Sequence, residues 1–173
     1  GDGFALLFDM NQLFESYVGA VARRVFSKDG LVVSLQGPKR HLARLASGSP
    51  VFLLKPDIVA TKSGKMAFVI DTKWKRLKEQ AYRDGVTSTD VYQMYAYSTQ
   101  YAPPDVLLLY PHHSELGEWR PRRAEYWVHG VDGNRDLNQR VGVSSLDLRD
   151  LNTVPMQLKS MFPADSRHTS IQK

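Results

Sequence analysis

The stretch that decides the fold spans residues 53–74 and reads LLKPDIVATKSGKMAFVIDTKW. Two apolar segments flank a short polar segment around Gly64, which is typical of a tight reversal, so the stretch predicts a β-hairpin. Each strand of this hairpin carries one aspartate, Asp57 on the first and Asp71 on the second, and Lys73 follows two residues later. The chemistry of the hairpin therefore depends on where these three side chains point.

The length of the turn determines whether Asp57 and Asp71 lie on one face of the hairpin, because side chains alternate between faces along a strand. We predict a three-residue loop, 62–64, whose glycine takes the positive φ that closes such a loop. This loop places the two carboxylates on one face with Cβ atoms roughly 5 to 7 Å apart, and Lys73 projects from the same face. A two-residue turn would separate the pair.

Two carboxylates about 5 Å apart repel each other by roughly 3 kcal/mol at an effective dielectric constant near 20, so Asp57 and Asp71 need a cation. Mg²⁺ prefers oxygen ligands and is bound by one or two carboxylates together with water and phosphate oxygens. The pair therefore predicts a Mg²⁺ site, which Mn²⁺ would also fit. A metal there activates water against a phosphodiester, while Lys73 stabilises the charge that develops on the phosphate.

The alternative interpretation is that the two aspartates are ordinary strand-end carboxylates and that Lys73 is a solvated charge. Residues 67–70 argue against it, because they are apolar on both faces and predict a central, buried strand. Charges at the end of such a strand are usually paired or bind a metal.

Five motifs occur between residues 4 and 111: FDMNQLFESYV at 8–18, KPDIV at 55–59, IDTK at 70–73, DVYQMYAY at 90–97 and LYP at 109–111. In this order they resemble the nuclease domain of McrC, the cleavage subunit of modified-cytosine-dependent restriction systems and a member of the PD-(D/E)xK superfamily. The resemblance implies an α/β fold with a core of helix, three-stranded meander, helix and further strand. It also implies Mg²⁺-dependent cleavage of double-stranded DNA, in partnership with McrB, a ring-forming AAA+ GTPase.

The resemblance assigns roles to individual residues. Asp57 and Asp71 match the metal ligands of the family, and Lys73 matches its catalytic lysine. Glu15 stands where an acidic residue of the first helix often completes the site, although an ordinary solvated carboxylate fits its position equally well.

Gln93 and Tyr97 match a Q-x-x-x-Y element of RecB-like members of the superfamily, in which it faces the site. Gln93 is accordingly expected among the catalytic residues. We also consider Tyr97 as a residue that stacks on DNA, against the more common role of such aromatics in a core.

Capping patterns predict two helices. Asp9 and Gln12 have the spacing of a helix start before an amphipathic helix at 10–26, and Thr87 and Asp90 form a capping box that opens a helix at 88–101. The remaining predicted elements are strands at 31–35, 51–61, 66–74, 106–110, 124–129 and 141–148, a short helix at 39–46 and a helix at 150–161.

We expect a single nuclease domain at 1–165, with its core at about 4–111, a C-terminal extension at about 120–163 and a flexible tail at 164–173. Segment 78–88 is polar, contains glycine and follows the site, and we expect it to order on DNA.

The formal charge of +5 and the isoelectric point near 9.5 favour a polyanionic partner. Lys75, Arg76 and Lys78 lead directly out of the predicted site, and clusters at 39–41 and 120–123 add positive charge. Such side chains contact phosphates without reading sequence.

Cysteine is absent, which excludes disulfides and cysteine-based zinc or nucleophile chemistry. His112 and His113 lack a completing metal-ligand spacing and are expected to be loop residues. Because the chain has no membrane-spanning apolar run and no targeting pattern, we expect no membrane partner and a cytoplasmic location.

The family carries an N-terminal region that docks into the GTPase ring, and nothing before Gly1 resembles it, so an excised domain is expected. Two other functions remain open at this point: a RecB-like repair or recombination nuclease, and a non-cleaving basic DNA-binding or assembly module on the same fold.

Overall fold

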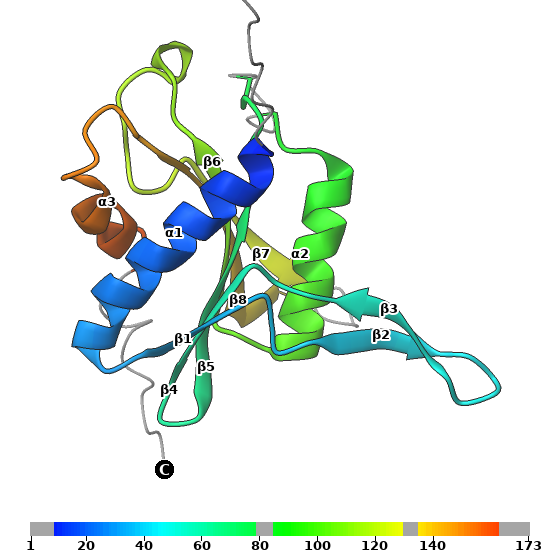
Figure 1. Cartoon of the computed structure of the whole chain (residues 1–173). Helices are drawn as coiled ribbons and strands as arrows, with labels where there is room; N and C mark the ends of the chain where they lie inside the picture. Colours follow the sequence, from blue (N-terminus) through cyan, green and yellow to red (C-terminus); the bar gives the residue numbers. More distant parts are fainter. Residues whose placement is uncertain (1–8, 79–84, 130–134, 163–173) are drawn as a thin grey trace, which may run out of the picture.

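The computed structural model describes residues 9–78, 85–129 and 135–162, and within them the chain forms a six-stranded mixed sheet with helices on both faces (Figure 1). The strands lie in the order β1 (Val32–Leu35), β4 (Ile58–Lys62), β5 (Lys65–Thr72), β6 (Asp105–Pro111), β8 (Arg135–Leu146) and β7 (Ala124–His129). The pairs β1·β4, β4·β5 and β7·β8 are antiparallel, whereas β5·β6 and β6·β8 are parallel. The predicted α/β class is confirmed.

Three helices cover this sheet. Helices α1 (Met10–Phe26) and α3 (Val154–Ser160) lie on one face, and α2 (Ser88–Tyr101) lies on the other (Figure 1). The predicted starts of α1 and α2 are confirmed, because the Asp9 carboxylate accepts hydrogen bonds from the first turn of α1 and Thr87 forms a capping box with Asp90. Two 3₁₀ turns, Ser27–Asp29 and Ser114–Leu116, complete the helical elements of the described residues.

Strand β5 is the centre of the core and is buried on both faces, as its apolar sequence predicts. Phe68 packs towards α1 and α3, where its ring stacks on that of Phe162 with centroids 3.9 Å apart. Val69 packs on the opposite face with Met94 of α2. Because side chains alternate, Asp71 has the parity of Val69 and belongs to the α2 side of the sheet.

The turn between β4 and β5 differs from the predicted three-residue loop. Lys62 pairs with Lys65, so the turn contains only Ser63 and Gly64, with φ values of +50° and +75°. Two consecutive residues at positive φ make the turn that matches the natural twist of a hairpin, which explains why the shorter turn forms here.

A β-bulge restores the parity that this shorter turn would otherwise lose. Ala60 pairs with Phe68 whereas Thr61 pairs with Met66, so Ala67 is an extra residue in β5. Beyond the bulge Ile58 pairs with Ile70, and the same register extended by one residue sets Asp57 opposite Asp71. The parity that the prediction requires is therefore kept by a different turn combined with a bulge, while the Asp57 side chain itself is oriented by its contacts with Thr72.

The predicted helix at 39–46 and the predicted single strand at 51–61 are both wrong. Residues 40–44 form strand β2 (Arg40–Arg44), which pairs with β3 (Pro50–Leu54) in a separate two-stranded sheet. The chain leaves β3 at Leu54, passes Pro56 and enters β4 at Ile58. A proline lacks the backbone donor that a continuous strand needs, and the pairing with β3 overrides the local helical pattern.

The C-terminal elements follow the predicted order with different bounds. The predicted strand at 141–148 is the second half of β8, and the predicted helix at 150–161 is confined to α3. The tail at 164–173 and residues 79–84 of the segment expected to order on DNA lie outside the described residues. Within the described part of the chain, no helix combines the length and the apolar character that crossing a membrane requires.

Substitutions in the β4–β5 turn should change the free energy of unfolding in opposite directions. Ser63→Asn creates the Asn-Gly pair that this turn favours and should add about 0.5 kcal/mol, whereas Gly64→Val forces a β-branched residue to positive φ and should cost at least about 1 kcal/mol. Urea denaturation measures both. Equal effects of the two variants would contradict the two-residue turn.

Candidate active site

The ends of β4 and β5 hold Asp57 and Asp71 side by side. The backbone N–H of Thr72 and its hydroxyl both donate to Asp57 Oδ2, at 2.7 and 2.8 Å. Asp57 Oδ1 accepts no hydrogen bond from the described residues. Asp71 is the penultimate residue of β5 and is only 2% exposed. One carboxylate is therefore held in place by β5, and the other is buried beside it.

A line of polar contacts runs from Asp71 to α2. The Lys73 ammonium lies 2.6 Å from Asp71 Oδ2 and donates to Gln93 Oε1 at 2.8 Å. The Gln93 amide in turn donates to the Tyr97 hydroxyl at 3.0 Å. Lys73 follows the last residue of β5, and its backbone N–H donates to the Leu109 carbonyl of β6, which anchors its main chain. The predicted residues Asp57, Asp71, Lys73 and Gln93 thus share one site.

The electrostatics of the site reflect a shortage of positive charge. Burial and then the neighbouring Asp57 carboxylate raise the pKa of Asp71 to about 6, although the Lys73 ammonium acts to lower it. Burial and then the Asp71 charge raise the pKa of Tyr97, so its hydroxyl remains neutral. One lysine does not compensate two carboxylates in this setting.

The aspartate pair fits a divalent cation that prefers oxygen ligands. Asp57 Oδ1 is open, and Asp71 Oδ2 has no directed hydrogen bond among the described residues, with Lys73 as its ion-pair partner. Mg²⁺ needs only one or two carboxylates, with water and phosphate oxygens for its other positions. Asp57 and Asp71 are therefore the residues that would hold it, and the additional positive charge would favour the ionised form of Asp71.

Glu15 lies near Asp57 but does not join a cluster of three carboxylates. Its side chain accepts a hydrogen bond from the Gln36 amide at 2.8 Å, and both residues line a cavity of about 280 Å³ together with Asp57, Ser16 and Leu35. Helix α1 covers the face of the sheet opposite to the side of Asp71. In the described ranges, no three His, Asp or Glu side chains are grouped closely enough to bind one metal ion. A metal role for Glu15 remains a prediction.

Gln36 is the residue of this neighbourhood that the sequence did not indicate. It follows β1, takes a φ of +54° and donates its backbone N–H to the Asp57 carbonyl at 2.8 Å. It thereby links Glu15 to Asp57. A single glutamine after a short strand belongs to no recognisable motif, so only the tertiary structure reveals it.

The three cations that follow the site are not equivalent. Lys75 forms an ion pair with the buried Asp90, where the effect of burial on the pKa of the carboxylate is outweighed by hydrogen bonds from Lys75 and Thr87, which lower it. Lys75 therefore braces the start of α2. Arg76 is exposed and pairs with exposed Glu115 at 2.9 Å, and Lys78 is also exposed. A role for Arg76 and Lys78 in phosphate contacts remains a prediction.

The structure corrects the interpretation of Tyr97 as a DNA-stacking residue. Its side chain is 2% exposed and packs in the core beneath α2, so its ring cannot reach a base. Its hydroxyl instead fixes Gln93. The exposed aromatics of this helix are Tyr92 and Tyr95, at 72% and 50%.

His112 and His113 lie directly after β6, as loop residues, in agreement with the sequence. His112 contacts the Ser145 hydroxyl and His113 contacts the Leu77 carbonyl. Both line a cavity of about 430 Å³ whose other lining residues are Trp74, Lys75, Arg76 and Pro111.

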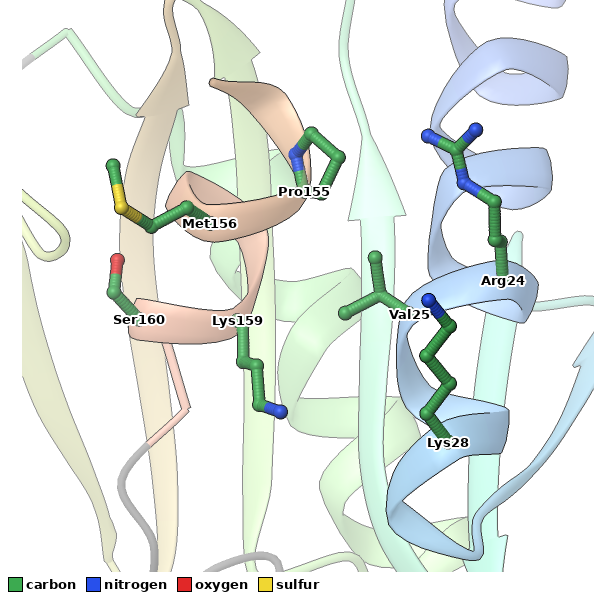
Figure 2. A pocket seen from close by; sticks show the side chains of 7 residues that line it. All are labelled: Arg24, Val25, Lys28, Pro155, Met156, Lys159 and Ser160. Atoms are coloured by element: carbon green, nitrogen blue, oxygen red, sulfur yellow. The ribbon is translucent and has the colours of Figure 1, made fainter. Parts of the chain in front are cut away.

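A further cavity of about 650 Å³ lies between α1 and α3, away from the aspartate pair (Figure 2). Arg24 of α1, Lys28 of the 3₁₀ turn that follows it and Lys159 of α3 line it, and Lys159 also pairs with Asp29 at 2.9 Å. No carboxylate is among its lining residues. This cavity lacks the ligands of a divalent metal and does not belong to the site.

The family model described as "McrBC 5-methylcytosine restriction system component" matches residues 2–111, which include α1, the aspartate pair, Lys73 and α2. The chain belongs to the McrBC family. No curated protein matches the sequence.

Among solved structures, the chain resembles one chain of a half-complex from the tetradecameric assembly of Thermococcus gammatolerans McrB AAA+ hexamers with bound McrC. The TM-score is 0.61 at 20% identity, and the match covers 84% of this chain. The match covers 30% of the other chain, so this McrBC family member spans less than a third of the length of the protein that it resembles. At this identity the likeness concerns the fold alone.

Asp71→Asn should stabilise the metal-free protein, by an amount that depends on pH. Because the folded-state pKa of Asp71 is raised from 3.8 to about 6, the wild type loses stability as pH rises through this window, and the loss is complete above it. A shift of about two pKa units, which already includes the favourable Lys73 pairing, corresponds to a gain of at most about 3 kcal/mol. Urea denaturation between pH 4 and 7.5, without divalent ions, measures the difference.

Asp147→Asn is the matched control with the opposite sign. The hydrogen bonds from Arg149 lower the pKa of Asp147 to about 2, so this carboxylate stabilises the fold above about pH 4 and the contribution is lost as pH falls towards 2. A gain from Asp71→Asn that is the same at every pH would contradict the buried, uncompensated carboxylate.

Proposed function

We propose that this McrBC family member is a Mg²⁺-dependent DNA endonuclease domain of the PD-(D/E)xK type. The observation that carries the proposal is the pairing of Asp57 and Asp71 at adjacent strand ends, with the Lys73 ammonium 2.6 Å from Asp71. The order of elements supports it: α1, then the antiparallel strands β1, β4 and β5, then α2 and the parallel strand β6. This is the helix, meander, helix and strand order of such nucleases, with β2 and β3 inserted.

Each residue of the site has a distinct part in phosphodiester hydrolysis. Asp57 and Asp71 would bind the metal, which when bound supplies an acidified water and neutralises charge on the phosphate. The Lys73 ammonium has three N–H donors, of which one faces Asp71 and one binds Gln93. The third has no partner among the described residues and would donate to a phosphate oxygen, where it would stabilise the charge that develops in the transition state.

Gln93 and Tyr97 position Lys73 and do not contact the reacting atoms in this arrangement. The Gln93 amide oxygen accepts from the ammonium, and the neutral Tyr97 hydroxyl accepts from the Gln93 amide nitrogen. Since the Lys73 ammonium can only donate, Gln93 turns its amide oxygen to the lysine and its NH₂ group to the Tyr97 hydroxyl, which accepts. Arg76 and Lys78 lie after the site and would hold the flanking phosphates of double-stranded DNA.

Alanine at either Asp71 or Lys73 should abolish cleavage while leaving DNA affinity nearly unchanged. Removal of Lys73 eliminates one transition-state donor, which is worth about 10²- to 10³-fold in cleavage rate and takes nicking below detection. Nicking of supercoiled plasmid with Mg²⁺, beside DNA binding measured without it, separates chemistry from affinity. A chelator should abolish the wild-type activity, and Mn²⁺ should restore it.

Lys65→Ala is the control, because Lys65 is an exposed cation at the other end of β5. It should cleave like the wild type. Equal cleavage by the wild type, Asp71→Ala and Lys73→Ala would overturn the nuclease assignment and leave the non-cleaving DNA-binding module as the function.

We further propose a McrB-like AAA+ GTPase ring as the partner of the full-length protein. The proposal rests on the family match and on the fold likeness to a chain from an assembly of McrB hexamers with bound McrC. A RecB-like repair nuclease would share the Gln93–Tyr97 pair but would not need the ring. The family match favours restriction of DNA that carries modified cytosine.

The full-length protein should co-purify with the GTPase ring, and the ring should raise its DNA cleavage. A pull-down with tagged ring protein measures the first effect, and plasmid cleavage with GTP measures the second. Full-length protein that cleaves without binding the ring would favour the repair nuclease.

A further inference from the structure

Strands β2 and β3 form an arm that projects from the body of the protein beside the C-terminal end of α2 (Figure 1). We call residues 39–55 the β2–β3 arm. The residues from Pro38 to Pro50 are all exposed, and so are the apolar side chains of Leu42, Leu45, Phe52 and Leu53, at 46–71%. An isolated two-stranded hairpin is marginally stable in water, so an arm of this kind needs either support or a partner.

The base of the arm is supported by α2. The Tyr101 hydroxyl donates to the Pro38 and Leu54 carbonyls, at 2.6 and 3.2 Å, and thus ties both strands together. The Arg40 guanidinium lies over the Tyr101 ring at 4.8 Å and donates to the Gln100 carbonyl. The arm is therefore fixed in direction at its base, while its outer part makes no such contacts.

The charge of the arm has one sign. It carries Lys39, Arg40, Arg44 and Lys55, and the sequence contains no Asp or Glu between Asp29 and Asp57. Arg40 is used at the base, whereas Lys39, Arg44 and Lys55 form no ion pair within the described residues. An exposed ribbon with cations and without carboxylates is complementary to a polyanion.

The arm is continuous with the aspartate pair. Gln36, three residues before the arm, binds both Glu15 and the Asp57 carbonyl. The last residue of the arm, Lys55, is separated from Asp57 by Pro56 alone. Whatever the arm binds is consequently held at a fixed distance from the site.

We propose that the β2–β3 arm lies in the major groove of the DNA duplex that the site cuts. The major groove, about 12 Å wide, admits a two-stranded β-ribbon. Lys39, Arg44 and Lys55 bind the backbone phosphates on its two sides, and the exposed Phe52 and Leu53 rest against base edges. This inference rests on the proposed function for the identity of the polyanion.

Backbone conformation supports a binding role for the outer part of the arm. Phe52 is 71% exposed and has a φ of +57°, a conformation that a bulky residue seldom takes. Strained residues of this kind cluster at sites that bind ligands. Pairing of the arm with the arm of a second copy would instead bring like charges together, which disfavours a dimer formed through the arms.

The test compares two triple variants of this chain that remove the same charge. Lys39→Gln/Arg44→Gln/Lys55→Gln removes three of the four Lys and Arg charges of the arm and leaves Arg40 at its base, and the matched control Lys28→Gln/Lys62→Gln/Lys65→Gln neutralises three lysines elsewhere. Both are made with Asp71→Asn, so that DNA is bound without being cut. Fluorescence anisotropy with a labelled duplex, over a range of salt concentrations, gives affinity and its salt dependence.

The arm triple should lower affinity at least about ten-fold at low salt and reduce the slope of log K against log salt by about 2 to 3, since each phosphate contact contributes about 0.9. The control triple should change affinity less than about two-fold. Equal effects of the two triples, or no DNA binding by the parent protein, would overturn the inference.

A shortened arm gives a geometric readout. Replacing residues 42–52 by Asn-Gly joins the paired residues His41 and Leu53 with a tight turn and keeps the contacts of Tyr101 at the base. The arm loses about 17 Å, so the protected DNA footprint should shorten by about five base pairs. An unchanged footprint would overturn the inference, and the charge triples decide it if the shortened protein does not fold.

The outcomes keep this inference separate from the proposed function. If the wild type cleaves DNA and the two triple variants bind it equally, the DNA-binding role of the arm is wrong and the nuclease assignment stands. If only the arm triple loses DNA affinity and the wild type does not cleave DNA, the nuclease assignment is wrong and the DNA-binding role of the arm stands. A dimer in sedimentation that is lost only when the arm is shortened, at unchanged DNA affinity, would assign the arm to a second copy and overturn the inference.

Discussion

The two hydrogen bonds from Thr72 to Asp57 are the constraint on which the site depends. They hold one carboxylate against the end of β5, where Asp71 is already buried, so the two negative charges cannot move apart. Burial and then the neighbouring Asp57 carboxylate raise the pKa of Asp71, so ionising it in the metal-free protein costs stability. Stability is reduced at the place where a divalent cation would be bound, which is the usual compromise of a functional site.

The position of Asp57 relative to Asp71 depends on features of the sheet that have no chemical role of their own. The bulge at Ala67 compensates the two-residue turn and sets Asp57 opposite Asp71. Because β5 is buried on both faces, the alternation of its side chains directs Asp71 towards α2. On that helix, Gln93 accepts a hydrogen bond from Lys73. The same helix that positions the lysine also braces the β2–β3 arm through Tyr101 at its other end. Helix α2 therefore connects the site with the surface that we assign to DNA.

Much of this arrangement was predictable from local patterns. The capping residues Asp9 and Thr87 marked the starts of both long helices, because a cap acts within one turn of the residues that it binds. The apolar run at 67–70 predicted a central strand, and the spacing of Asp71 and Lys73 predicted their proximity. The family motifs added Gln93, which the structure places against Lys73.

The sequence by itself thus determined the helix starts, the buried strand and the residues that form the site. Only the tertiary structure decided that Lys75 pairs with Asp90, that Tyr97 is buried and that residues 40–44 form a strand with 50–54. It also decided which turn joins β4 to β5 and that Gln36 reaches Glu15 and Asp57. The reason is physical: capping and periodicity act over a few residues, whereas these contacts join segments that chain folding brings together and that no local pattern encodes.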